Sequence, residues 1–209
     1  MAYQLSDINF KTVADPKGFI EECDEVYRRR VETAADKIIA NRKNSPIVLL
    51  SGPSGSGKTT TARKISEELE RKGVHAHYVG MDDYFVTVDP ATAPRTAEGE
   101  IDLESPLCLD MELLNEHFDL LAQGKRIYVP KYEFSRQMRM FEPSKSIKLK
   151  KDEIVVFEGI HALNDMITER HPEAFKLYIS ARSNVEFNGS VVFKGTWFRL
   201  CLLYTSDAA

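Results

Sequence analysis

One stretch in the first third of the chain has residues whose types and order suit phosphate binding. Residues 52–59 read Gly-Pro-Ser-Gly-Ser-Gly-Lys-Thr and fit the pattern G-x-x-x-x-G-K-[ST]. Glycines let the backbone approach an anion closely and turn its N–H groups toward the phosphates. Lys58 would place a positive charge on the terminal phosphates, and the Thr59 hydroxyl would bind Mg²⁺. The residues expected to bind ATP with magnesium are Gly52, Ser54, Gly55, Ser56, Gly57, Lys58, Thr59 and Thr60.

Two acidic residues follow predicted strands, and both could serve the chemistry of a bound nucleotide. Asp82 comes after the strand predicted at 75–79, where a carboxylate could accept a proton from an attacking hydroxyl or help hold the metal. Glu158 directly follows the run at 154–157 and is expected on the Mg²⁺ side. The simpler alternatives are a turn or helix cap formed by the Asp-Asp pair and an N-cap formed by Glu158. His161 is expected to pack or hydrogen-bond locally, with a catalytic base as its alternative.

The elements around these residues alternate between strand and helix. Strands are predicted at 47–50, 75–79, 154–157 and 176–180, and helices at 17–42, 61–71 and 111–122. Continuous apolar runs are typical of strands that are buried on both faces. The alternation predicts an α/β fold, a P-loop NTPase with a doubly wound, mainly parallel sheet and flanking helices. The carboxyl ends of parallel strands face the ligand, so Asp82 and Glu158 should lie near the phosphates.

The segments GPSGSGKTTTA, MDDYF, DLESP, VPKYEF and VVFEGI occur in this order between residues 47 and 180. This series resembles the uridine kinase and phosphoribulokinase superfamily, and most of all the uridine kinase-like nucleoside kinases of bacteria. The resemblance implies ATP-dependent phosphorylation of a nucleoside 5′-hydroxyl, with Asp82 and Lys58 as catalytic residues and Thr59, Glu158 and Asp82 around Mg²⁺. A related kinase of pantothenate or a sugar phosphate is the alternative within the enzyme class. Outside that class, the alternative is a nucleotide-binding module without transfer chemistry; a GTPase switch is disfavoured because no N-K-x-D string occurs.

The resemblance also implies a substrate-binding set of Glu104, Tyr132, Phe134, Gln137 and Arg139. Tyr132 and Phe134 match aromatic residues that pack against the base, and a flat nucleobase suits such stacking. Their alternative is an ordinary pair of core aromatics in a hairpin. Two positions depart from uridine kinases: Glu104 stands where an aspartate precedes His-Pro, and Gln137 stands where a histidine reads the pyrimidine. An amide both donates and accepts hydrogen bonds, so Gln137 allows pyrimidine recognition without fixing it.

Three regions are expected along the chain. Residues 1–45 form a helical extension that should pack on the outside of the core, with partner binding as its alternative, and Pro46 follows its end. Residues 46–200 form the kinase core. Residues 201–209 resemble a translated sequencing adapter, with a divergent natural tail as the alternative. We therefore expect an artefactual tail and a core that lacks the arginine-rich lid helix of the family, which could leave the chain inactive.

Composition limits the partners. The 209 residues are 43% hydrophobic and 29% charged, with a formal charge of −4, and an acidic balance argues against nucleic-acid binding. No apolar run approaches the roughly 20 residues of a membrane span, and the start lacks a signal-peptide pattern. The three cysteines share no metal-ligand spacing. We expect a cytoplasmic protein whose partner is a small-molecule nucleoside, without nucleic acid or membrane, and for which a homo-oligomer is an open option.

Overall fold

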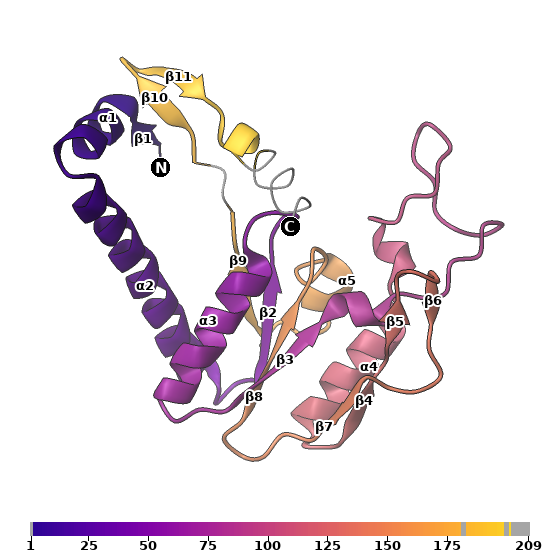
Figure 1. The fold of residues 1–209 in the computed structure, drawn as a ribbon. Helices are drawn as coiled ribbons and strands as arrows, with labels where there is room; N and C mark the ends of the chain where they lie inside the picture. Colours follow the sequence, from indigo (N-terminus) through magenta and orange to yellow (C-terminus); the bar gives the residue numbers. More distant parts are fainter. Residues whose placement is uncertain (1, 181–182, 199–200, 202–209) are drawn as a thin grey trace.

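A four-stranded parallel sheet forms the centre of the computed structural model, which describes residues 2–180, 183–198 and 201 (Figure 1). Its strands lie in the order β3-β8-β2-β9. Their bounds are Ile47–Ser51 for β2, Ala76–Gly80 for β3, Ile154–Glu158 for β8 and Phe175–Tyr178 for β9. Every neighbouring pair is parallel, so the carboxyl ends of all four strands meet at one edge. The predicted parallel sheet is confirmed.

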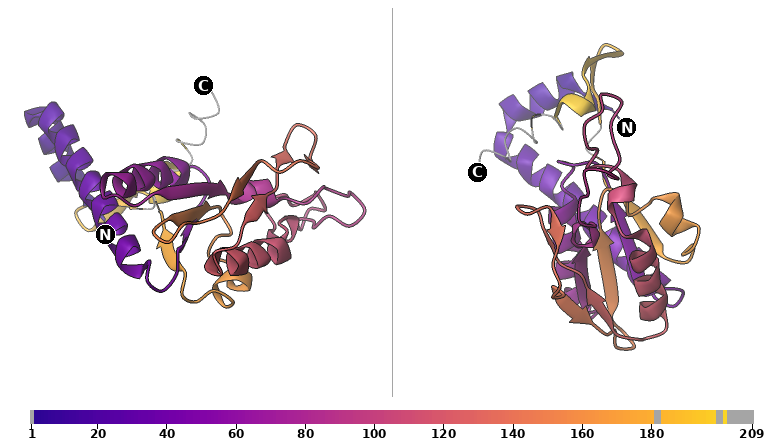
Figure 2. Two further views of the ribbon diagram at one scale, coloured as in Figure 1. Left: turned by 90° about the horizontal axis from the view of Figure 1, so that it is seen from below. Right: turned by 90° about the vertical axis from the view of Figure 1, so that its right-hand side faces the viewer.

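Both faces of this sheet are buried. Helices α2 (Pro16–Asn41) and α3 (Lys58–Arg71) cover one face, and α4 (Met111–Ala122) and the short α5 (Asp165–Thr168) cover the other (Figures 1 and 2). In β2, Val48 and Leu50 pack with α2 and α3, while Ile47 and Leu49 pack on the α4 side. Each fully buried aliphatic side chain contributes about 1.5–3 kcal/mol. The doubly wound α/β fold is thus the arrangement that buries an unbroken apolar strand.

Helix boundaries follow local signals. Asp15 caps α2 by accepting a hydrogen bond from the Gly18 N–H at 3.0 Å, and Pro16 occupies the first helical turn. The sequence predicts α3 from residue 61, but it begins at Lys58, directly after Gly57. Lys58, Thr59 and Thr60, the last of the predicted phosphate-binding residues, therefore form the first turn of the helix, which the apolar spacing alone does not reveal. The predicted helix at 111–122 is confirmed.

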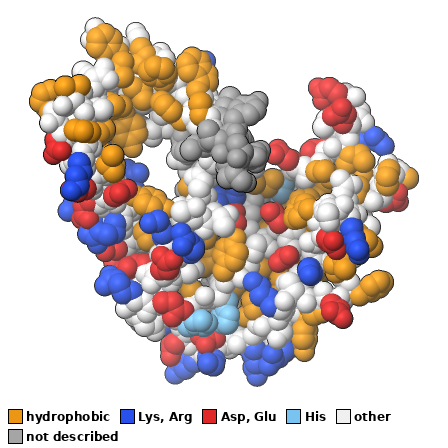
Figure 3. Space-filling model, viewed as in Figure 1, with side chains coloured by type: hydrophobic (Ala, Val, Ile, Leu, Met, Phe, Trp, Pro, Cys, Tyr) orange, Lys and Arg blue, Asp and Glu red, His pale blue; other side chains and the backbone are white. Residues whose placement is uncertain are grey.

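The chain's first residues pair with a late hairpin. Strand β1 (Tyr3–Gln4) lies parallel to β10 (Val185–Phe187), which pairs with β11 (Ser190–Phe193), and α1 (Leu5–Ala14) packs beside α2 (Figure 1). Large apolar side chains are exposed on these elements, among them Tyr3, Phe10, Val13, Phe187 and Phe193. Figure 3 shows hydrophobic side chains gathered at its upper left, where α1 and this hairpin lie in Figure 1. The division at residue 45 stays a prediction. Residues 202–209 of the predicted tail lie outside the described residues.

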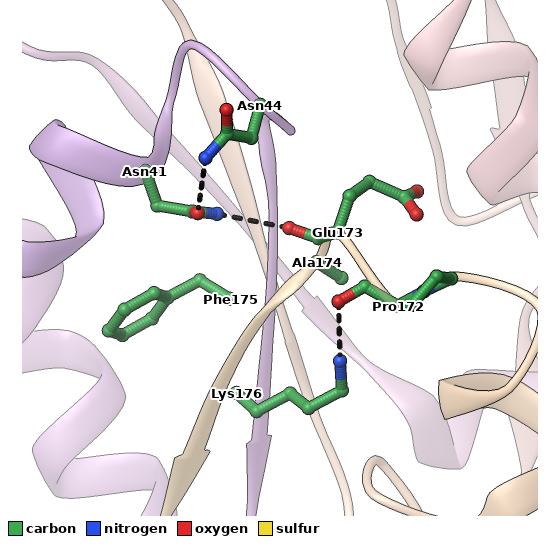
Figure 4. Close-up of a pocket in the computed structure, with 7 residues that line it drawn as sticks. All are labelled: Asn41, Asn44, Pro172, Glu173, Ala174, Phe175 and Lys176. Carbon is green, nitrogen blue, oxygen red and sulfur yellow. Dashed lines mark hydrogen bonds between the residues drawn. The ribbon is translucent and has the colours of Figure 1, made fainter.

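Helix α2 is fixed to the core at its C-terminal end (Figure 4). Asn41 Nδ2 donates a hydrogen bond to the Glu173 carbonyl at 3.1 Å, just before β9, and Asn44 Nδ2 donates to Asn41 Oδ1 at the same distance. The residues that make these bonds line a shallow pocket of about 600 Å³. Higher on the helix, Val31, Ala35 and Ile38 are buried against α3. The predicted packing of the extension on the core is therefore confirmed for α2.

Small elements complete the other side of the molecule. They are the 3-10 turns η1 (Met81–Tyr84) and η2 (Pro106–Cys108) and two hairpins, β4 (Ile127–Val129) with β7 (Lys145–Ile147) and β5 (Tyr132–Glu133) with β6 (Met138–Arg139). The turn η1 directly continues β3. Among the described helices, none is long and apolar enough to cross a membrane.

Candidate phosphate-transfer site

The loop between β2 and α3 has the geometry of an anion cradle. Gly55 and Gly57 have φ values of 70° and 82°, which side-chain-bearing residues rarely adopt. A Cβ on Gly52 would lie 2.3 Å from the Ile179 carbonyl oxygen, so only glycine fits there. No side chain caps the N-terminus of α3, which leaves its first N–H groups for a ligand. Ser56 Oγ is buried and makes no hydrogen bond within the described chain. A phosphate would satisfy these donors.

Glu158 gathers the side chains around this cradle. It is 8% exposed at the end of β8. Its Oε2 accepts hydrogen bonds from Tyr78 OH at 2.8 Å and from Thr59 Oγ1 at 3.2 Å. Its Oε1 lies 3.8 Å from Lys58 Nζ, which also donates to the Pro53 carbonyl. The structure thus brings Lys58, Thr59 and Glu158 together, as the sequence predicts.

Asp82 lies in η1 at the same edge of the sheet. Although its side chain is open to solvent, the packed surroundings raise its pKa above the usual aspartate range. The negative charge of Glu158 raises it further, and the Lys58 ammonium opposes both effects. A raised pKa makes a carboxylate a stronger proton acceptor. Asp82 therefore lies close enough to Lys58 and Glu158 for their charges to change its pKa.

A close backbone contact holds η1 against the end of β8. A Cβ on Gly159 would lie 2.8 Å from Met81 Cβ, so the strand end and the turn can approach this closely only through glycine. The next turn is tied back as well, because Ser51 Oγ donates to the Ile160 carbonyl at 2.9 Å. His161 Nε2 lies 2.7 Å from the Glu104 carbonyl oxygen. A carbonyl only accepts, so this nitrogen donates, in line with the predicted local hydrogen bonding of His161.

The β5–β6 hairpin is attached to η1 through Arg139. Its guanidinium donates to Asp110 Oδ2 and to the Tyr84 carbonyl, both at 2.7 Å, and to the Phe85 carbonyl at 3.2 Å. Asp110 also caps α4 by accepting from the Leu113 N–H at 3.1 Å. These three acceptors surround one planar guanidinium group and fix the position of the hairpin. In this state the Arg139 guanidinium holds the hairpin in place, and its predicted contact with substrate stays a prediction.

The two predicted stacking residues have different surroundings. Tyr132 is 7% exposed and packs at ring distances of 5.4 Å from Phe85 and 4.9 Å from Phe134. Phe134 is 59% exposed and presents its ring to solvent. Gln137, at the hairpin turn, is exposed and has a positive φ of 51°. Glu104 is also exposed, in the loop that His161 holds. Of this predicted set, Phe134 has the most accessible ring.

Three contacts at the site were not predicted from the sequence. They are the Tyr78 bond to Glu158, the Asp110 bond to Arg139 and the cluster of Phe85 with the hairpin aromatics. Tyr78 could have been found, because residues 78 and 80 lie on the same face of β3 and Gly80 pairs with Glu158. The Asp110 contact has no such signal, since it joins the N-cap of α4 to a hairpin strand with which α4 shares no pairing register.

The family model and the curated relatives point to one family. The model of the phosphoribulokinase/uridine kinase family matches residues 47–192. The uridine kinases of Deinococcus deserti and Ligilactobacillus salivarius are 30% and 34% identical over 68% and 61% of this chain. That of Halobacterium salinarum is 31% identical over 56% of this chain. These alignments span 64%, 57% and 48% of the three relatives, so the chain spans about half to two thirds of their length.

A solved structure supports the fold. A possible uridine kinase from Bacillus stearothermophilus superposes with a TM-score of 0.50 at 23% identity, over 63% of this chain and 68% of that one. The family match covers well over half of the chain and includes the cradle, Asp82, Glu158 and the β5–β6 hairpin. The chain therefore belongs to the phosphoribulokinase/uridine kinase family.

Proposed function

We propose that the protein transfers the γ-phosphoryl group of ATP to the 5′-hydroxyl of a nucleoside. The observation that carries this proposal is the cluster of Lys58, Thr59 and Glu158 around an anion cradle, with Asp82 coupled to it. Phosphoryl transfer depends on positioning and on charge stabilisation more than on covalent chemistry by the protein. These side chains supply both requirements at one edge of the sheet.

The oxygens at the cradle fit a magnesium ion. Thr59 Oγ1 and Glu158 Oε2 lie 3.2 Å apart, and Mg²⁺ prefers a few such oxygens beside substrate phosphates. Bound there, Mg²⁺ would neutralise part of the phosphate charge. Lys58 would turn from the Pro53 carbonyl toward the terminal phosphates, where a cation is more strongly bound than at a neutral acceptor.

Asp82 would accept the proton of the attacking hydroxyl. Its raised pKa makes it a better base than an ordinary aspartate. The acceptor would then lie between η1 and the β5–β6 hairpin, with its base on the exposed ring of Phe134. The name uridine kinase, which relatives about 30% identical carry, supports a nucleoside as the acceptor.

The decisive test is ADP release with a panel of nucleosides, ATP and Mg²⁺, with pantothenate and sugar phosphates as alternative acceptors. We expect release with a pyrimidine nucleoside, and its loss in Lys58→Ala. Asp82→Asn should keep ATP binding and lower kcat by about 10²–10⁴-fold, the usual effect of removing a general base. ATP binding without release for any acceptor would instead indicate a nucleotide-binding module.

The base-binding part is tested by calorimetric titration with the preferred nucleoside. Phe134→Ala should weaken binding by about 1–3 kcal/mol, the scale of one base–aromatic contact, and Phe134→Tyr should be mild because it keeps the ring. Tyr132→Phe is the matched control, since it keeps the packing of a buried ring. Gln137→His should change the preference among bases. Unchanged nucleoside affinity in Phe134→Ala would show that the base does not bind at this hairpin.

A further inference from the structure

Two histidines and a glutamate meet at the amino ends of β3 and β8. His75 and His77 are two residues apart along extended chain, so their side chains lie on the same side of it. Strand pairing sets Ala76 beside Ile154, and the Ile154 N–H donates to the His75 carbonyl at 3.0 Å, which brings Glu153 next to His75. One nitrogen of each histidine and one oxygen of Glu153 lie within 4.8 Å of one another.

This edge of the sheet lies opposite the phosphate cradle. The cradle follows the carboxyl end of β2, and Glu158 ends β8, whereas Glu153 directly precedes the first residue of β8. The proposed phosphoryl transfer therefore uses none of the three side chains. Within the described part of the chain, no other three His, Cys, Asp or Glu side chains form such a group. Histidine atoms are visible near the bottom of Figure 3, where β3 begins in Figure 1.

We infer that His75, His77 and Glu153 form a binding site for a zinc ion. Imidazole nitrogens and carboxylate oxygens are both zinc ligands, and two histidines with one glutamate form a set that holds Zn²⁺ while water takes the fourth position. Mg²⁺ prefers oxygen ligands, so the two imidazoles would distinguish this site from a magnesium site at the cradle. The inference does not depend on the proposed function.

The three ligand atoms are spaced nearly as a zinc ion requires. Atoms at about 2.0–2.1 Å from a tetrahedral ion lie about 3.3 Å from one another. His77 Nε2 and Glu153 Oε2 are already 3.0 Å apart. His75 has to approach them by at most about 1.5 Å, because no two of the three atoms are more than 4.8 Å apart. Its side chain is exposed, so a rotation of the ring can supply this movement.

Neighbouring groups hold the ligands in place. Glu70, in the last turn of α3, contacts His75 Nδ1 and accepts from the Ala76 N–H at 3.3 Å. A carboxylate bound to one ring nitrogen fixes the orientation in which the other nitrogen can bind a metal. The Lys150 N–H donates to Glu153 Oε2 at 3.0 Å, and the exposed Lys150 ammonium lies beside the other oxygen, Oε1, at 3.4 Å.

A zinc ion at this place would join the end of α3 to the first residues of β3 and β8. Because it would bind the folded chain and not the unfolded one, it should stabilise the fold in proportion to its concentration. The expected role is therefore structural. It is measured by zinc affinity and by unfolding, neither of which requires kinase activity.

The affinity is measured by competition with a chromogenic zinc chelator at neutral pH, with excess Mg²⁺ and no nucleotide. We expect one tightly bound Zn²⁺ per chain. His77→Gln keeps an amide that can donate to Glu153 but removes the imidazole, and His75→Gln changes an exposed side chain. Each should weaken zinc binding by about 100-fold or more, and Glu70→Gln, which alters only an outer partner, by about tenfold.

Matched variants control for other zinc-binding groups. His161→Gln makes the same substitution at the histidine that binds the Glu104 carbonyl, and a Cys23→Ser, Cys201→Ser double variant removes the exposed thiols. Both should bind Zn²⁺ as the wild type does. Zn²⁺ should raise the urea midpoint of the wild type and leave that of His75→Gln unchanged. The inference fails if the wild type binds no Zn²⁺, if both His75→Gln and His77→Gln retain the wild-type affinity, or if either control loses it.

Discussion

Replacing Gly159 with alanine should destabilise the protein and disturb the turn η1, which holds the proposed base Asp82. The new Cβ would lie 2.8 Å from Met81 Cβ and 3.1 Å from Met81 Sδ. Met81 Cβ is attached to the backbone of η1, so a side-chain rotation cannot relieve the first contact. The φ angle of Gly159 is not in the left-handed region, and the conflict is therefore purely steric. The expected response is a shift of η1 away from β8, which would carry Asp82 with it.

The magnitude follows from the cost of overpacking, about 1–3 kcal/mol. With a urea m-value of about 2 kcal/mol/M, the unfolding midpoint should fall by roughly 0.5–1.5 M. Gly80→Ala is the matched control on the neighbouring strand. Its Cβ would meet nothing closer than Tyr78 OH at 3.8 Å, and its φ of −74° suits alanine. This variant should be neutral or gain about 0.5 kcal/mol by restricting the unfolded chain.

Urea unfolding of the three proteins checks the stability, and ADP release checks the displacement of Asp82. Gly159→Ala should lower kcat more than it lowers ATP affinity, because the cradle lies on β2 and α3 while the contact lies between β8 and η1. A Gly159→Ala protein as stable and as active as Gly80→Ala would refute this account of the contact.

Three further outcomes follow from the site. Tyr78→Phe removes the 2.8 Å bond to the buried Glu158 carboxylate and should lower the free energy of unfolding by about 1.5–3 kcal/mol, measured in urea. Arg139→Lys loses the planar guanidinium group that hydrogen-bonds Asp110 and two carbonyls. It should raise the KM for nucleoside with little change in the KM for ATP. Because folding raises the pKa of Asp82, the stability from its protonated form is present below the unfolded pKa and is lost as pH rises through the folded value. Asp82→Asn should therefore unfold at higher urea than the wild type at pH 7 and show no such gain at pH 3.

The amino-acid sequence by itself determines the phosphate loop and the sheet. The cradle is local: its glycines and Lys58 are consecutive, so their backbone angles and the following helix follow from neighbouring residues. The strands are equally direct, since unbroken apolar runs such as residues 47–50 require burial on both faces. The positions of Asp82 and Glu158 then follow from parallel pairing, which brings strand ends to one edge.

Only the tertiary structure decides which of the remaining side chains can meet a ligand. Tyr132 and Phe134 are two residues apart and look alike in sequence, yet one is buried against Phe85 and the other is open. Arg139 is already bound to Asp110. These outcomes depend on contacts between segments far apart in the chain. The exposure of these side chains and the distances between them are fixed only when the apolar cores form on both faces of the sheet. No local sequence pattern predicts them.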